Sequence, residues 1–250
     1  MRFVGIDLAW SDRNTSAAVA LALEGDEGRL TAWEDGLGGD DEVYTFVREA
    51  VGEGPGLVAV DAPLLVPNEE GTRPCDLEVS REFRRYEAGG YPANRRRFGG
   101  RVRGEELVRS LEGEGFVHSP YIPKRTPVRQ VVEVYPHPAS VRLFGLERTF
   151  KYKARPGRPL EFRLSEFRRY REHLRQLRSP GLCAEEILRM DPEGLRGGAL
   201  KRYEDLLDAL FCAYIGLYCW YWGQDGYQVF GDLETGYVVV PKGGDTHGGT

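Results

Sequence analysis

Residues 2–23 read RFVGIDLAWSDRNTSAAVALAL and consist of two apolar runs joined by a polar loop. The runs at 2–9 and 16–23 are short and nearly continuous in apolar side chains, which is typical of strands near the centre of a sheet. The turn sequence EGDEG at 24–28 leads into a third strand-like run at 29–34. Three strands in immediate succession predict an antiparallel meander.

A helix and a fourth strand follow the meander. The acidic triplet at 40–42 suits a helix N-terminus, and apolar residues then recur at helical spacing up to about residue 53. GLVAVD at 56–61 is a short buried strand that stops at Ala62-Pro63. With one more strand predicted at 128–135, this order indicates an α/β fold, a mixed sheet of about five strands flanked by helices.

The rest of the chain is expected to be mainly helical, with one insertion. Six prolines and two glycine pairs weaken the pattern between about residues 66 and 127. We interpret this stretch as an Arg-rich insertion in a single domain that spans residues 1–242. The other expected elements are helices at about 76–86, 104–114, 161–177, 184–190 and 199–222, strand-like pieces at 226–240 around a Gly231-Asp232 turn, and a disordered tail at 243–250.

The composition is that of an ordinary globular protein. With 250 residues, 41% of them hydrophobic, and a formal charge of −5, it excludes a disordered chain, a collagen-like repeat and a disulfide-built miniprotein. The charge is unevenly distributed, because residues 73–178 hold 25 basic and 13 acidic residues and the remainder holds 9 and 26. A basic middle in an acidic framework fits an anionic partner, and a surface of solvated charge explains it equally well.

Cysteine spacing and the N-terminus bear on the kind of site and on localisation. The four cysteines form no CxxC pair and have no neighbouring histidines, which argues against a zinc site and a disulfide framework. The N-terminus lacks a long apolar segment, so we expect no signal peptide and a cytoplasmic protein. The apolar run at 206–222 contains Asp208 and many aromatic residues, which favours a buried helix over a membrane span.

Acidic residues occur inside segments that are otherwise apolar. Asp7 lies within the first strand, Asp61 ends the fourth, and Glu133 interrupts VVEVY in the strand at 128–135. Asp205 and Asp208 lie three residues apart on nearly the same face of the last helix. A buried carboxylate is costly unless it is paired, hydrogen bonded or bound to a cation, so these residues call for a common cause.

Convergence of these carboxylates would build an oxygen-rich site. Mg²⁺ and Mn²⁺ prefer carboxylate and water ligands, and two such ions about 4 Å apart would serve phosphodiester hydrolysis. For each aspartate taken alone, a cap, a turn or an arginine partner is the competing explanation, most of all for Asp61 before Ala-Pro. Their joint occurrence favours the metal site.

The ordered motifs resemble a known family. The β-β-β-α-β order, an Asp in the first strand, an Asp at the end of the fourth and an Asp-x-x-Asp pair on a late helix resemble the ribonuclease H-like superfamily in its resolvase-like arrangement. More narrowly, GIDLAWSDRNTSAAVAL, VAVDAPL, GTRPCD, EVYPHPA, TFKYKARPGR and YEDLLDALFCAY resemble the DUF429 family, described as predicted ribonuclease H-like nucleases. These blocks span nearly the whole chain.

The resemblance implies roles for particular residues. Asp7, Asp61 and Asp208 would be ligands of Mg²⁺ or Mn²⁺, and Asp205 would be a fourth carboxylate, either a ligand or next to one. Glu133 matches the EVYPHPA block of the family, outside the resolvase pattern, and is a further catalytic candidate.

A basic loop is a candidate for binding nucleic acid. Arg95, Arg96 and Arg97 lie in GGYPANRRRFGGR, with Tyr91 and Phe98 close by. Arginines beside aromatic rings suit phosphate contacts combined with base stacking. An exposed loop with solvated arginines is the alternative.

Three further residues are candidates for catalysis or substrate binding. Lys151 and Lys153 in TFKYKARPGR would neutralise a scissile phosphate or a small anion, unless they belong to an ordinary exposed turn. His137, between two prolines after the Glu133 strand, would be a general acid or base, with a structural role as the alternative.

The sequence therefore predicts a metal-dependent nuclease that hydrolyses phosphodiester bonds of DNA or RNA. One rival is an actin-like or sugar-kinase-like phosphotransferase, which also begins with an Asp-bearing strand. The chain has no P-loop, and 250 residues are few for two duplicated subdomains. The other rival is a non-catalytic nucleic-acid-binding or protein-binding module on the same fold. The sequence leaves the oligomeric state open.

Overall fold

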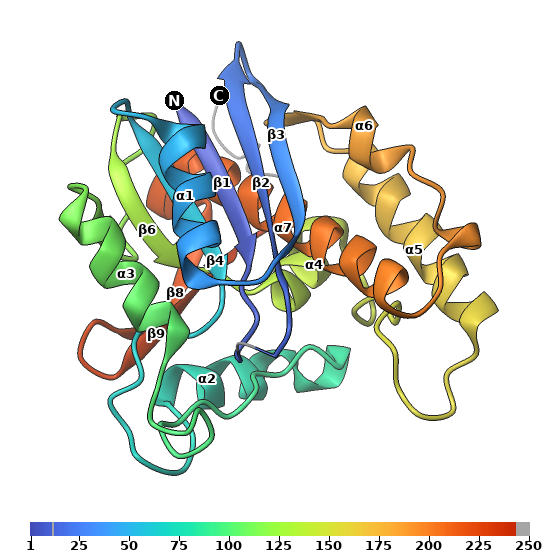
Figure 1. Cartoon of the computed structure of the whole chain (residues 1–250), viewed down its shortest axis with the longest axis horizontal. Helices are drawn as coiled ribbons and strands as arrows, with labels where there is room; N and C mark the ends of the chain where they lie inside the picture. The colour runs from blue at the N-terminus through green and yellow to red at the C-terminus, as the bar shows by residue number, and fades with distance from the viewer. Residues whose placement is uncertain (12, 244–250) are drawn as a thin grey trace.

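A seven-stranded sheet forms the centre of the computed structural model, which describes residues 1–11 and 13–243 (Figure 1). The strand order across the sheet is β5-β6-β4-β1-β2-β3-β7. Strands β1 to β3 form the predicted antiparallel meander, and the other pairings are parallel. The strands are β1 (Arg2–Asp7), β2 (Ser16–Glu24), β3 (Glu27–Leu37), β4 (Gly56–Asp61), β5 (Val117–His118), β6 (Arg129–Glu133) and β7 (Gly181–Cys183).

The register brings acidic residues to one edge of the sheet. In the parallel pair of β1 and β4, Asp7 lies opposite Asp61, and in the pair of β4 and β6, Val60 lies opposite Glu133. Because these three strands run in the same direction, their carboxyl ends meet at the same edge. The position of a candidate site is thus set by strand pairing.

Helices cover both faces of the sheet and extend beyond its acidic edge (Figure 1). Helix α7 packs on β1, β2 and β4 from one side, while α1 and α3 cover the other side. Helix α2 lies beyond the carboxyl ends of β1 and β4 (Figure 1). The helices are α1 (Asp40–Val51), α2 (Pro74–Phe83), α3 (Arg103–Gly113), α4 (Pro136–Phe144), α5 (Leu160–Arg175), α6 (Glu185–Leu188) and α7 (Gly197–Trp222), with short 3₁₀ turns η1 (Arg84–Tyr86), η2 (Pro192–Gly194) and η3 (Gly223–Asp225).

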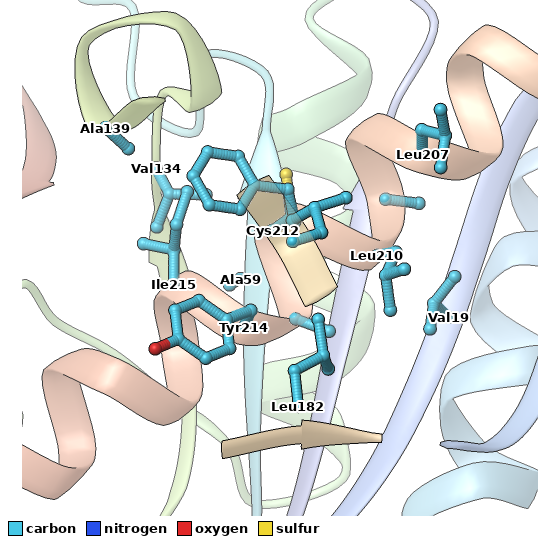
Figure 2. Packing of buried hydrophobic residues seen from close by; sticks show 14 of the residues in the cluster. Val19, Ala59, Val134, Ala139, Leu182, Leu207, Leu210, Cys212, Tyr214 and Ile215 are labelled. Carbon is cyan, nitrogen blue, oxygen red and sulfur yellow. The ribbon is translucent and has the colours of Figure 1, made fainter. Parts of the chain in front are cut away.

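Close contact between α7 and β1 requires a glycine. A Cβ atom on Gly5 would lie 2.1 Å from the carbonyl oxygen of Ala209 and 2.1 Å from the amide nitrogen of Ala213. The strand can therefore touch the helix backbone only at a residue without a side chain. Figure 2 shows side chains of α7, including Leu210, packed among residues of β2 and β4 such as Val19 and Ala59. This packing fixes the height of α7 along β1.

The α/β class and the mixed sheet are confirmed, but the expected strand count of about five was too low. Strands β5 and β7 have two and three residues, too short to show any alternation of apolar side chains. The predicted insertion stretch contains α2, η1, α3 and β5, between β4 and β6. Most other boundaries moved by one to three residues, and the meander strands β2 and β3 are longer than predicted.

Two local predictions were wrong. The sequence predicts no helix directly after the strand at 128–135, yet α4 begins there, at Pro136. Proline is tolerated in the first turn of a helix, where its missing N–H has no intrahelical acceptor. The last two strands, β8 (Tyr227–Asp232) and β9 (Gly236–Pro241), form a separate hairpin whose turn lies at 233–235 and not at Gly231-Asp232.

Two further expectations concern the C-terminal tail and membrane-crossing helices. The disordered tail was predicted at 243–250, and residues 244–250 lie outside the described residues. Across residues 1–11 and 13–243, no helix combines the length and the apolar character needed to cross a membrane.

Candidate functional site

Four aspartates interact at the carboxyl ends of β1 and β4. Asp7 and Asp61 come from the neighbouring strands, and Asp205 and Asp208 come from adjacent turns of α7. Burial, followed by the charge of Asp7, raises the pKa of Asp61 well above its usual value. Burial and again Asp7 raise the pKa of Asp205 to about 8. The four carboxyl groups therefore share one electrostatic environment, in which burial and mutual repulsion oppose the ionisation of Asp61 and Asp205.

Two lysines supply positive charge to this carboxylate cluster, which consists of Asp7, Asp61, Asp205 and Asp208. Lys153 Nζ lies 2.8 Å from Asp208 Oδ2, and Lys201 forms an ion pair with Asp205. Burial opposes ionisation of Asp208, but Lys153 and its other neighbours hold the pKa of this carboxyl below its usual value. The Tyr152 hydroxyl donates a hydrogen bond to Asp208 Oδ1. Asp208 is thus an ionised carboxylate held by a lysine and a tyrosine.

The donor set suits a hard divalent cation in its chemistry. All four candidate ligands are carboxylates, which Mg²⁺ and Mn²⁺ prefer. Asp208 Oδ2 is buried with no aligned hydrogen-bond donor, although Lys153 is nearby. Within residues 1–11 and 13–243, however, no three His, Cys, Asp or Glu side chains are already grouped to hold a metal ion. Metal binding would therefore require the carboxylates to close up and Lys153 to release Asp208.

Two cavities with different lining residues border the cluster. Asp7 and Asp205 line a cavity of about 320 Å³ together with Lys201 and Arg202. Asp61 lines a narrower cavity of about 60 Å³ with residues that include Trp10. Three of the four carboxyl groups thus border cavities, whereas Asp208 is fully buried.

A comparison with protein families identifies the chain. The family model described as "Protein of unknown function (DUF429)" matches residues 5–234. The chain belongs to the DUF429 family. No curated protein and no solved structure matches the chain. The matched range contains the whole carboxylate cluster and Lys153.

Glu133 of this DUF429 chain belongs to a buried ion-pair triad with Arg73 and Asp76. Arg73 donates hydrogen bonds to both carboxylate oxygens of Glu133, at 2.6 and 3.0 Å, and pairs with Asp76 at 2.9 Å. The Leu64 N–H also donates to Glu133, at 2.8 Å. Both oxygens are therefore occupied, and Glu133 anchors the segment between β4 and α2 beside Asp61. This arrangement gives Glu133 a structural role, and the catalytic role predicted for it stays a prediction.

His137 lies at the start of α4, near the cluster. Its Nδ1 is 3.0 Å from the Thr149 hydroxyl oxygen. Burial, followed by the charge of Lys153, lowers the pKa of His137 to about 3. His137 is therefore neutral near pH 7, and a pKa this low makes it a weak base there. Its predicted role as a general acid or base stays a prediction.

The three arginines of the basic loop have different surroundings in the DUF429 structure. Arg95 pairs with Glu105 at 3.0 Å, and Arg96 pairs with Glu70 at 2.6 Å. The Arg97 guanidinium lies 5.5 Å from the centre of the Trp10 ring. Trp10 also lines the cavity at Asp61. Of the three arginines, Arg97 is therefore the one connected to the site, through its contact with Trp10.

The lysines of TFKYKARPGR have separate partners. Lys151 Nζ lies 2.6 Å from Glu87, whereas Lys153 contacts Asp208 in the carboxylate cluster. Lys153, which is predicted to bind phosphate, thus already neutralises Asp208, one of the predicted metal ligands. Both lysines line a third cavity near His137.

Sequence reasoning missed several residues of the DUF429 site. Lys201 precedes Asp205 by four positions, so helical spacing alone could have placed the two side by side. Tyr152 lies between the two predicted lysines, but an apolar ring in that position gave no sign of its contact with Asp208. Trp10 lies three residues after the end of β1, yet only the folded loop brings it to Arg97. Arg73 lies in a proline-rich stretch that gave no signal for a buried guanidinium.

Proposed function

We propose that this DUF429 protein is a divalent-metal-dependent hydrolase of phosphodiester bonds in nucleic acid. The observation that carries the proposal is the electrostatic cluster of Asp7, Asp61, Asp205 and Asp208 at the carboxyl ends of β1 and β4. Such a concentration of partly buried acids is costly to folding, and perturbed carboxyl groups that border cavities are typical of functional sites.

The topology supports the same proposal. The β-β-β-α-β order of the ribonuclease H-like resemblance is present as β1, β2, β3, α1 and β4, with β6 continuing the sheet beside β4. The two strand aspartates are register partners, and the helix that bears the Asp-x-x-Asp pair packs on their sheet. This is the arrangement that the resemblance implies for a resolvase-like carboxylate site.

Each side chain in and around the carboxylate cluster has a role in the proposed reaction. Asp7, Asp61 and Asp208 would hold Mg²⁺ or Mn²⁺, with Asp205 beside them. When bound, the ions would supply Lewis-acid stabilisation of the phosphoryl oxygens and would activate water at neutral pH. Lys153, released from Asp208, would bind a phosphate oxygen. His137 would accept a proton once a bound phosphate raises its pKa from about 3 toward neutrality. Arg97 and Trp10 would hold the strand through a phosphate contact and base stacking.

Cleavage assays on purified full-length protein test this function. Labelled single-stranded and duplex DNA and RNA are incubated with Mn²⁺, with Mg²⁺ or with chelator. We expect metal-dependent cleavage that falls at least 100-fold in Asp7→Asn and in Asp61→Asn. The matched control is Asp225→Asn, since Asp225 is an exposed carboxylate in η3.

Two outcomes would overturn the proposal. One is wild-type protein that cleaves none of these substrates with either metal. The other is an Asp7→Asn variant that cleaves as fast as the wild type. Thermal stabilisation by ATP in the absence of cleavage would point to the phosphotransferase alternative, and salt-dependent oligonucleotide binding without Mn²⁺ binding would point to a non-catalytic module.

A further inference from the structure

The cavity near His137 is lined mainly by cationic and hydroxyl side chains. It has a volume of about 150 Å³ and lies between the start of α4 and the loop that leads to α5. Its polar lining comes chiefly from Tyr91, His137, Lys151, Lys153, Arg155 and Arg158. We call it the α4 cavity.

Two positive charges of the α4 cavity are not balanced by carboxylates. Lys151 is paired with Glu87, and Lys153 is paired with Asp208. Arg155, by contrast, donates to the Tyr91 hydroxyl at 2.7 Å, and Arg158 donates to the backbone oxygen of Lys153 at 2.5 Å. Neither arginine forms an ion pair within 4.0 Å among residues 1–11 and 13–243. The cavity therefore has a net charge of about +2.

The α4 cavity has a buried wall. Thr149 and Phe150 line it, and each of these residues is only 3% exposed. An internal phosphodiester needs chain to leave on both sides, and it carries a single negative charge. A terminal phosphate needs one exit and carries a charge of about −1.5 to −2 at pH 7. Both shape and charge favour the terminal group.

We propose that the α4 cavity binds the terminal phosphate of a phosphomonoester, with Arg155 and Arg158 as its principal ligands. Planar guanidinium groups bind phosphate oxygens through paired hydrogen bonds, and here their present acceptors are neutral and easily exchanged. The Tyr91 hydroxyl adds a further donor at the mouth.

The location of the cavity suggests what carries this phosphate. Lys153 belongs both to the α4 cavity and to the ion pair with Asp208. A terminal phosphate held here would lie next to the carboxylate cluster. If the proposed nuclease function is correct, the substrate class is a nucleic-acid strand with a phosphorylated end. The phosphate site itself does not depend on that function.

Calorimetry without divalent metal tests the site directly. The full-length protein is titrated, in chelator, with inorganic phosphate and with three otherwise identical single-stranded oligonucleotides that carry a 5′-phosphate, a 3′-phosphate or no terminal phosphate. We expect measurable phosphate binding and at least tenfold tighter binding of one phosphorylated oligonucleotide than of the unphosphorylated one. Tenfold corresponds to about 1.4 kcal/mol.

Variants assign the effect to the cavity. Arg155→Gln and Arg158→Gln, separately and combined, should weaken phosphate binding, by at least tenfold for the pair. The control Arg109→Gln, on α3 and outside the cavities described, should leave it unchanged. Because Arg155 is exposed and Arg158 half-buried, both variants should fold, which their unfolding curves will show.

The results separate this inference from the proposed function. Equal binding of all three oligonucleotides, or wild-type phosphate binding in the double variant, overturns the phosphate site whether or not the protein cleaves nucleic acid. Phosphate binding that depends on the two arginines supports the site, even if no metal-dependent cleavage is found and the proposed nuclease function fails.

Discussion

Lys153 Nζ lies 2.8 Å from Asp208 Oδ2, so a lysine from the loop before α5 neutralises a fully buried carboxylate of α7. The same ammonium group interacts electrostatically with Asp7 and Asp61. A divalent cation in the carboxylate cluster would compete with this lysine for Asp208. The competition between Lys153 and a metal ion for this carboxylate is thus a central property of the site.

Replacing Lys153 by Met should destabilise the protein in chelator by about 2–3 kcal/mol. Breaking a fully buried pair costs about 3–5 kcal/mol, and the Lys153 side chain is 32% exposed, which reduces the penalty. Urea unfolding measures the change, and Lys124→Met, at an exposed lysine, should have little effect. If the cluster binds metal, the variant should also bind Mn²⁺ more tightly than the wild type by calorimetry. Unchanged stability would contradict the ion pair.

His137 should make the protein less stable in acid. Its pKa is about 3 in the folded state, against about 6.5 in the unfolded chain. Between these values the unfolded state binds more protons, so the free energy of unfolding falls as pH falls from about 6.5 to about 3. At pH 5 the loss should reach up to about 2 kcal/mol, from 1.36 kcal/mol per pH unit.

The variant His137→Gln separates this contribution from those of other acids. Gln can keep a hydrogen bond to Thr149 but does not titrate. Unfolding free energies measured from pH 4 to pH 8 should therefore show a smaller slope in the variant below pH 6.5. Parallel curves for the two proteins would mean that His137 is not held in its neutral form.

Arg73 should be essential for stability. Arg73→Met would leave the buried carboxylates of Glu133 and Asp76 without their shared partner, which should cost about 3–5 kcal/mol. Arg96 provides the matched comparison because its pair with Glu70 is exposed, with side-chain exposures of 77% and 69%. Arg96→Met should change stability by less than about 1 kcal/mol. Similar losses in the two variants would contradict the assigned role of the triad.

Arg97 should contribute more than Arg95 to binding nucleic acid. Arg97 lies over Trp10 at the cavity next to Asp61, whereas Arg95 is held by Glu105. If Arg97 contacts a phosphate, Arg97→Gln should lower the slope of log affinity against log salt by about 1. Fluorescence anisotropy with a single-stranded oligonucleotide at several salt concentrations measures this slope. An effect confined to Arg95→Gln would place the strand elsewhere.

Most of the fold could be predicted because its signals are local. Strand β4 was predicted at its observed bounds, since an apolar run between Gly and Ala-Pro identifies a buried strand without reference to the rest of the chain. Strands β5 and β7 could not be predicted, because two or three residues show no period and form only where a neighbouring edge accepts them. Helix α4 was missed because prolines in its first turn resemble a strand end.

The candidate site shows the same division. Asp7, Asp61, Asp205 and Asp208 stand out in the sequence because each interrupts an apolar segment, and the cost of burying a charge makes such positions informative. The ion-pair partners of buried acids, by contrast, can lie far away in the sequence. Lys153 and Asp208 are 55 positions apart, and Arg73 and Glu133 are 60 apart.

The sequence alone therefore determined the α/β class, the order of the first elements and the identity of the carboxylates, since these depend on hydrophobic pattern and on residues close in the chain. Only the tertiary structure decided the pairs between distant residues, Lys153 with Asp208 and Arg73 with Glu133. Those pairs depend on the register of β1 with β4 and on the close contact of α7 at Gly5, which is set by packing between segments far apart in the sequence.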